Sequence, residues 1–249
     1  MNNSEKILII GESCIDTFRY GKCGRMCPEA PVPVFNPVRS TSNPGMATNV
    51  MNNVLSLGTD CDIITNDNWK NLRKIRYIDD KTNQMFIRVD ESDDEVSRCN
   101  LGAFKDDLKK YGAIIISDYC KGFLTEQDIQ YICEQNSLVF LDTKKNLGPW
   151  CESATFIKIN YYEYEKTKHL VSSSTLGKLI VTLGKDGCKY REQIFGVPEV
   201  EIKDSSGAGD TFIAAMACEY MKNGDVEKAL IFANQCATKV VQKRGVTTV

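Results

Sequence analysis

The sequence predicts an α/β fold with a doubly wound, mostly parallel sheet. Short apolar runs, of which residues 6–11 (Lys-Ile-Leu-Ile-Ile-Gly) are the first, have the composition of parallel strands that are buried on both faces. Longer segments with apolar residues at helical spacing lie between these runs. Strands that alternate with helices favour a parallel sheet covered on both sides. The 249 residues are enough for one sizeable domain of this class.

The predicted elements alternate along the chain after this first strand. Residues 17–39 are rich in proline, arginine and β-branched residues, which predicts extended segments outside the main sheet. A helix is predicted from about Ala47 to Leu57, because apolar residues recur at helical spacing after Pro44 and Gly45. Further strands are predicted at 61–64, 74–78, 84–89, 113–117, 138–142, 155–159 and 179–183, and further helices at 101–110, 125–135, 207–222 and 225–243.

Composition and charge narrow the class of protein. The 31 basic and 33 acidic residues leave a net charge of −2, so neither nucleic acid nor an acidic membrane is an expected partner. No apolar run is long enough to span a bilayer, and no apolar signal segment opens the chain, which predicts a cytoplasmic protein. Eleven dispersed cysteines indicate reduced thiols. Cys23 and Cys27 have no second pair or neighbouring histidine, so a zinc site is not expected.

A turn of small residues opens directly into an apolar helix near the C-terminus, at Gly207-Ala208-Gly209-Asp210. Glycine lets backbone N–H groups approach a ligand closely, and the start of a helix binds anions. The aspartate is placed to take a proton from an attacking hydroxyl as charge builds on a transferring phosphoryl group. A capped helix after a tight turn is the alternative interpretation. We favour the anion site, because two glycines and an acid share one turn.

This segment resembles the second sequence motif of the ribokinase-like (PfkB) carbohydrate kinases, with Ser205 in place of the usual threonine. Residues 21–34 are similar to the segment after the first strand in the kinase half of bacterial D-glycero-β-D-manno-heptose-7-phosphate kinase/ADP-heptose synthase. The resemblance covers nearly the whole chain. It implies a ribokinase-like fold in one domain, residues 1–249, with a small β lid from residues 17–39 and with residues 74–90 as a further candidate. The other matching segments are 86–90, 117–122, 160–163, 181–184 and 233–249.

The resemblance also implies roles for individual residues. Asp210 would be the catalytic base, and Gly207, Ala208 and Gly209 would form an anion hole. The substrate would be held by Asp16, Gly45, Asn49, Arg88, Lys121, Asp142 and Lys144, and the nucleotide by Asn160, Thr182, Gly184, Gly187 and Asn234. Glu163 would act on Mg²⁺ through water.

For several of these residues, a purely structural role is the alternative interpretation. Asp16 could cap a loop, Arg88 could be a surface arginine, and Lys121 could be a solvated loop lysine. The spacing of Asn160 and Glu163 also fits a helix capping box. For phosphate binding, an arginine fork and a lysine at the end of a strand are nevertheless suitable donors.

Besides Ser205, the sequence departs from the family pattern at three places. Thr143 stands where the family has proline between Asp142 and Lys144. Met46 replaces the second of two glycines, where it could stiffen a hinge or narrow the pocket, or simply favour a helix. Residues 65–71 bridge a gap of roughly twenty residues, about one helix–strand unit. That loss removes a peripheral layer of the sheet or marks a degraded enzyme.

The function implied is that of an ATP- and Mg²⁺-dependent sugar-phosphate kinase. The expected reaction converts D-glycero-D-manno-heptose 7-phosphate to the 1,7-bisphosphate in the synthesis of ADP-heptose for lipopolysaccharide. A kinase for another sugar and a weakened, ligand-binding homologue are the alternatives. No adenylyltransferase domain is recognised in the chain, so a separate protein is expected to supply that step. Three prolines at 28, 31 and 33 limit central-strand pairing, and we expect a homodimer through residues 17–39.

Overall fold

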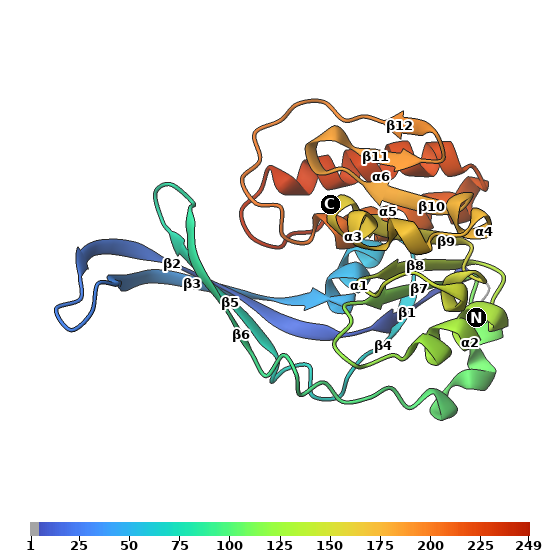
Figure 1. Cartoon of the computed structure of the whole chain (residues 1–249), viewed down its shortest axis with the longest axis horizontal. Coiled ribbons are helices and arrows are strands. Elements are labelled where there is room, and N and C mark those ends of the chain that lie inside the picture. The colour runs from blue at the N-terminus through green and yellow to red at the C-terminus, as the bar shows by residue number, and fades with distance from the viewer. Residues whose placement is uncertain (1–4) are drawn as a thin grey trace.

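An eight-stranded sheet forms the centre of the molecule (Figure 1). The computed structural model describes residues 5–249. The strand order is β12-β11-β10-β9-β8-β7-β1-β4, and all neighbours from β10 to β4 are parallel. The doubly wound, mostly parallel sheet is therefore confirmed. Its strands are β1 (Ile7–Gly11), β4 (Cys61–Ile64), β7 (Ala113–Asp118), β8 (Val139–Thr143), β9 (Phe156–Asn160), β10 (Leu179–Thr182), β11 (Cys188–Tyr190) and β12 (Gln193–Phe195).

Helices cover both faces of this sheet, which explains why its central strands are mostly apolar. Ile7 and Ile9 pack against one helical layer, whereas Leu8 and Ile10 pack against the other. All four side chains are essentially inaccessible to solvent. The first layer consists of α1 (Ala47–Ser56), α5 (Ala208–Asn223) and α6 (Val226–Val241), and the second is centred on α2 (Glu126–Gln135).

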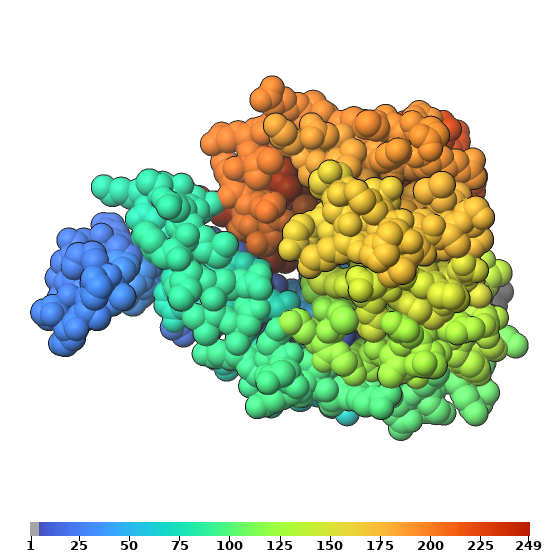
Figure 2. Space-filling model, in the orientation of Figure 1, coloured from blue at the N-terminus to red at the C-terminus, as the bar shows by residue number. Residues whose placement is uncertain are grey.

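A separate four-stranded sheet extends away from the main body (Figures 1 and 2). Its order is β3-β2-β5-β6, so β3 and β6 form its edges. Residues 17–39 lie outside the main sheet, as predicted, and residues 74–90 supply the other two strands. The prolines of β3 are tolerated because an edge strand pairs on one side only. The strands are β2 (Ser13–Met26), β3 (Pro33–Met46), β5 (Arg73–Asp79) and β6 (Met85–Glu91).

Every predicted strand is present, with ends that differ by at most two residues. The predicted helix at 101–110 is wrong in type. It consists of two 3₁₀ helices, η2 (Leu101–Ala103) and η3 (Lys105–Lys110), because Phe104 between them adopts φ −140°. Several short elements were not predicted: α3 (Tyr161–Thr167), α4 (Ser173–Leu176), β11, β12 and the 3₁₀ helices η4 (Pro149–Cys151), η5 (Lys168–Leu170) and η6 (Gly184–Asp186).

β4 forms one edge of the main sheet, at the point where the sequence predicts the loss of a helix–strand unit. Residues 65–72 run to β5 without a helix or a strand. Part of the space is covered by residues 95–111, in which Tyr111 donates to Asp62 Oδ2 at 2.9 Å and the carbonyl of Glu95 accepts from Asn68 at 2.6 Å. Residues 5–249 contain no helix with the length and apolar character needed to cross a membrane.

Met46 stands immediately before α1 with φ 60° and ψ −130°, a backbone conformation that favours glycine. The helix begins at Ala47, so the interpretation of Met46 as an ordinary helix former is wrong. Its side chain is buried, and its Sδ lies 3.2 Å from the Nζ of Lys74 on the second sheet. The methionine therefore links the start of α1 to β5.

Candidate active site

The start of α5 lies against two other elements that carry polar side chains. Gly207 caps the helix with φ 80°, and a Cβ there would lie 2.7 Å from Asn49 Nδ2. A Cβ on Gly209 would lie 2.9 Å from Lys158 Nζ. Both glycines thus let side chains from α1 and β9 approach the N–H groups of the helix start. The interpretation of this turn as a plain cap does not explain these close approaches.

Asp210 is a buried carboxylate in the first turn of α5. Its Oδ2 accepts from Asn49 Nδ2 at 2.9 Å, and its Oδ1 accepts from the Tyr119 hydroxyl at 2.6 Å. Burial raises the pKa of Asp210 to about 6, although the hydrogen bonds from Asn49 and Tyr119 oppose the rise. A carboxyl with this pKa is suited to accept a proton near neutral pH. The structure thus brings together Asp210 and Asn49, which the sequence had related only through the family.

Tyr119 was missed by the sequence prediction. It follows β7, and its backbone N–H donates to Glu12 Oε2 at 2.8 Å. Glu12 is fully buried and also accepts from the N–H of Lys121, so it fixes the turn that carries the tyrosine. Burial raises the pKa of Tyr119 well above its ordinary value, so the hydroxyl stays a proton donor toward Asp210. Neither the tyrosine nor the glutamate carries a signal of its own in one sequence.

Lys158 is a second residue that the sequence prediction missed. It lies in β9 with only 6% exposure, and its Nζ donates to Asp142 Oδ2 at 2.7 Å. The same ammonium group faces Gly209 at the start of α5. Asp142, one of the predicted substrate residues, therefore serves as the carboxylate partner of a buried cation beside the helix start. A lysine inside the apolar strand of residues 156–160 was the available signal.

Asp16 lies on β2 and is 5% exposed. Arg76 on β5 donates to its Oδ1, and the two form a buried ion pair. A Cβ on Gly45 would collide with Asp16 Oδ2, so the glycine is required for the carboxylate to occupy this place. The predicted sugar residues Asp16 and Gly45 are thus neighbours. Arg76 is a further member of the cluster that sequence reasoning missed.

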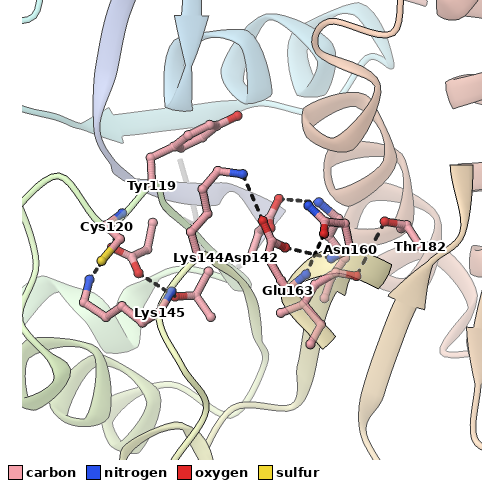
Figure 3. A network of polar contacts seen from close by, with 12 residues as sticks. Tyr119, Cys120, Asp142, Lys144, Lys145, Asn160, Glu163 and Thr182 are labelled. Carbon is pink, nitrogen blue, oxygen red and sulfur yellow. Dashed lines mark hydrogen bonds and ion pairs between the residues drawn. The ribbon is translucent and has the colours of Figure 1, made fainter. Parts of the chain in front are cut away.

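Three cations that the sequence proposed for phosphate binding are each paired with a carboxylate. Arg88 is half exposed on the edge strand β6 and binds Asp90. Lys121 binds Asp93, which belongs to the acidic run at 91–95. Lys144 lies 3.1 Å from Glu163 Oε1, with its Nζ 4.7 Å from the ring centre of Tyr119 (Figure 3). Burial lowers the pKa of Lys144, but Asp142 and Glu163 raise it by more.

Asn160 and Glu163 form a capping box at the start of α3. Glu163 Oε2 accepts from the Asn160 N–H at 2.7 Å, and Asn160 Oδ1 accepts from the Glu163 N–H at 2.9 Å (Figure 3). The capping alternative is therefore correct as a description of the structure. Together with Lys144, these contacts engage both oxygens of Glu163. Thr182 lies at the end of the neighbouring strand β10, with its Oγ1 3.5 Å from the Ile159 carbonyl.

A pocket of about 450 Å³ lies beside the start of α5. Asn234 on α6 lines it and donates to the Phe195 carbonyl at 2.7 Å. Gly187 packs so tightly on that same carbonyl that a Cβ would collide with it. Predicted nucleotide residues Gly184 and Asn234 line the pocket, whereas Thr182, Gly187 and Asn160 do not. The other lining residues include Val197, Pro198, Val200, Ile202, Ala208 and Val241.

A comparison with protein families identifies the chain. The model of the pfkB family carbohydrate kinases matches residues 115–249, which include Tyr119, Lys158 and Asp210. The chain belongs to this family. Among solved structures, ribokinase from Thermotoga maritima has a TM-score of 0.73 at 17% identity over 96% of this chain and 94% of its own. Arabidopsis thaliana ribokinase complexed with ribose and ATP has a TM-score of 0.72 at 12% identity, over 97% of this chain and 94% of that one.

Within the pfkB family, the chain is similar to curated proteins that share the name HldE. The bifunctional protein HldE of a Nitratiruptor species is 31% identical over 98% of this chain, and that of Helicobacter acinonychis is 31% identical over 96%. The chain spans 63% of the length of each of these relatives. The first alignment extends over 292 positions, more than the 249 residues of the chain, so the relative contains residues that this chain lacks.

The pocket beside α5 is suited to a nucleotide. Its walls are mixed, with apolar residues beside Lys185, Asp186 and Glu199, and Ala208 at its edge is the first residue of the helix whose N–H groups can receive phosphates. Residues 5–249 contain no group of three or more acidic, histidine or cysteine side chains that could hold a metal ion.

Proposed function

We propose that this pfkB family chain is an ATP-dependent sugar-phosphate kinase. The observation that supports the proposal best is the buried Asp210 at a glycine-lined helix start. This carboxylate has a pKa of about 6 and lies next to a pocket of nucleotide size. Phosphoryl transfer requires backbone N–H groups that can come close to the phosphates, a base with a suitable pKa and a pocket for the nucleotide. The alternative of a weakened, ligand-binding homologue would not need to maintain a buried charge at this position.

The reaction follows from this arrangement. Asp210 accepts the proton of the sugar hydroxyl, whose oxygen forms a bond to the γ-phosphorus as the bond from that phosphorus to the ADP oxygen breaks. N–H groups of residues 207–209 and the Lys158 ammonium stabilise the charge that develops on the phosphoryl oxygens. Asp16 and Asn49 position the sugar. Mg²⁺, when bound to the nucleotide, would neutralise phosphate charge, with Glu163 as a candidate contact through water.

We further propose that the substrate is D-glycero-D-manno-heptose 7-phosphate, phosphorylated at the anomeric oxygen to the 1,7-bisphosphate. Similarity to the HldE proteins over nearly the whole chain supports this substrate over other sugars. Adenylyl transfer, which reaches ADP-heptose only after the 7-phosphate has been removed, would be carried out by a separate protein or by a region outside these 249 residues. The cytoplasm, where ATP is available, is the proposed location.

We also propose that the second sheet covers the sugar and joins two copies of the chain. Asp16 on β2 is its proposed sugar contact. Ile87 and Val89 on β6 are 56% and 37% exposed, and exposed apolar side chains on an extended sheet favour a partner. A molecular mass measured in solution at micromolar concentration tests the homodimer; a fully active monomer contradicts it.

Substrate preference provides the test of the proposed function. We expect heptose 7-phosphate to be used far better than unphosphorylated heptose, because one charge-assisted phosphate contact contributes about 1.5–3 kcal/mol, or roughly ten- to a hundredfold in binding. The assay measures ATP consumption with a panel of sugars and identifies the product by mass and NMR. Equal use of both heptoses would favour a kinase for another sugar, and no consumption with any sugar would favour the ligand-binding homologue.

In Tyr119→Phe, the acid limb of the kcat/KM–pH profile is expected to move to higher pH. In the wild type, kcat/KM should fall as pH drops through about 6, because Asp210 must be ionised to accept the proton. The Tyr119 hydrogen bond stabilises the ionised carboxylate, so its removal raises the pKa of Asp210 further. Profiles of both proteins between about pH 5 and 8 measure the shift. Substrate phosphates also titrate near pH 6, but equally in both profiles. If the acid limbs of the two profiles coincide, the Tyr119 hydroxyl does not influence the pKa of Asp210.

A further inference from the structure

Lys74 on β5 is a buried cation without a carboxylate partner. The residue is 9% exposed. Its Nζ lies 3.2 Å from Met46 Sδ and 4.9 Å from the ring centre of Tyr119. Within residues 5–249, no ion pair includes this side chain. A thioether and an aromatic face are weak partners for an ammonium group, which has three hydrogens to donate.

Several other buried carboxylates in the described part of the chain are paired with a cation. Asp16 is paired with Arg76, Asp142 with Lys158, and Asp118 with a third cation, Lys145. Burying a charge without a partner is costly, and proteins rarely tolerate it unless the charge meets a ligand or performs chemistry. Among residues 5–249, no carboxylate lies within ion-pair distance of the Lys74 ammonium, although Asp16 and Asp90 are in register with Lys74 on the flanking strands. Both of these carboxylates are held by arginines. The unpaired ammonium therefore points to an anion that binds beside it.

The position of Lys74 indicates which anion this is. In the parallel pairing of β2 with β5, Lys74 is in register with Asp16, so both side chains project from the same face of the second sheet. On the other side, the ammonium faces the ring of Tyr119, whose hydroxyl binds Asp210. Lys74 thus lies between the proposed sugar contact and the proposed base. A ligand held by both would bring its own substituents to this ammonium group.

We propose that Lys74 binds the phosphate group already present on the sugar substrate and so determines the preference for phosphorylated sugars. The inference rests on the proposed kinase function and adds a residue to it. Arg88, Lys121 and Lys144 would each have to leave a carboxylate to bind that phosphate. Lys74 has no carboxylate competitor of this kind in an ion pair among the described residues. Ligand binding would therefore satisfy this ammonium group without breaking an ion pair.

Lys74→Met tests the proposal, because methionine keeps much of the side-chain volume and removes the charge. We expect the KM for heptose 7-phosphate to rise roughly ten- to a hundredfold, the scale of one lost charge-assisted contact, while the KM for ATP and the use of unphosphorylated heptose change less than about twofold. Lys74→Arg should recover part of the preference. Lys81→Met, at an exposed turn of the same sheet, is the control and should behave as the wild type.

Equal loss of activity with both sugars would overturn the proposal and give Lys74 a general electrostatic role. Calorimetric binding of phosphorylated and unphosphorylated sugars separates this inference from the proposed function. If no sugar is phosphorylated by the wild type, selective weakening of phosphorylated-sugar binding in Lys74→Met still supports the inference, and unchanged binding contradicts it. Thermal unfolding provides an independent measurement. Losing an unpaired buried charge should leave Lys74→Met at least as stable as the wild type, whereas a structural lysine would make it less stable.

Discussion

Asp210→Asn is expected to lower turnover by about a hundredfold or more, the usual effect of removing a general base. Asparagine preserves the shape of the side chain and can still accept the hydrogen bond from Asn49 or Tyr119, but it cannot take up the proton of the sugar hydroxyl. ATP affinity should change little, because Asp210 does not line the pocket beside α5. Steady-state kinetics and nucleotide binding measure the two effects.

The matched control for this variant is Glu219→Gln, which makes the same chemical change further along α5, outside the site. It should retain normal turnover. Near-normal turnover in Asp210→Asn would reduce the aspartate to a residue that caps a helix.

The thermal stability of Asp210→Asn provides a second measurement, and we expect it to rise although turnover falls. Burial holds the pKa of Asp210 at about 6, above its ordinary value of 3.8, so ionisation opposes folding. The penalty is fully present above about pH 6 and disappears as pH falls below 3.8; a shift of this size corresponds to at most about 3 kcal/mol. The variant should therefore unfold at a higher temperature than the wild type at about pH 7.5, with a smaller difference near pH 4.5. Loss of both activity and stability would instead indicate misfolding.

Most of the main sheet could be predicted because its signal is local. Each parallel strand is a run of apolar residues, and burial on both faces leaves no other pattern for such a strand. The strands β11 and β12 were missed because three residues are too few for a periodic pattern. Residues 101–110 have apolar side chains at helical spacing, yet they are not one α-helix: Phe104 leaves helical geometry between two 3₁₀ turns.

The candidate site likewise contains some residues that a single sequence reveals and others that it does not. Residues 207–210 are contiguous, so their glycines and acid formed a pattern that a single sequence displays. Tyr119 follows β7, Lys158 lies on β9, and Arg76 and Lys74 lie on β5 of the second sheet, so only the arrangement of these strands brings the four residues together. The pairing of Arg88 with Asp90 and of Lys121 with Asp93 was equally hidden, because no sequence pattern indicates which carboxylate a cation will meet. Side-chain direction, not residue type, was the missing information.

Gly45→Ala is expected to weaken sugar binding about ten- to a hundredfold, because the new methyl group would collide with Asp16 Oδ2. The collision is with a carboxylate that Arg76 holds in a buried ion pair, so Asp16 can yield only by breaking that pair or by shifting the backbone of β3. Either movement displaces the proposed contact with the sugar hydroxyls. Turnover at saturating sugar and the KM for ATP should change much less, since Asp210 and the nucleotide pocket lie on other elements.

Gly24→Ala is the matched control for this change, because it lies on the same sheet and a Cβ there meets no atom within 4 Å. It should bind sugar normally. The comparison distinguishes a steric effect at Asp16 from a general intolerance of the second sheet to alanine. If Gly45→Ala binds the sugar as well as Gly24→Ala does, Asp16 does not hold the substrate, and its ion pair with Arg76 serves only to join β2 to β5. If both variants lose sugar binding, the sheet as a whole responds to alanine, and the role of Asp16 would have to be tested by Asp16→Asn, which removes the charge without adding volume.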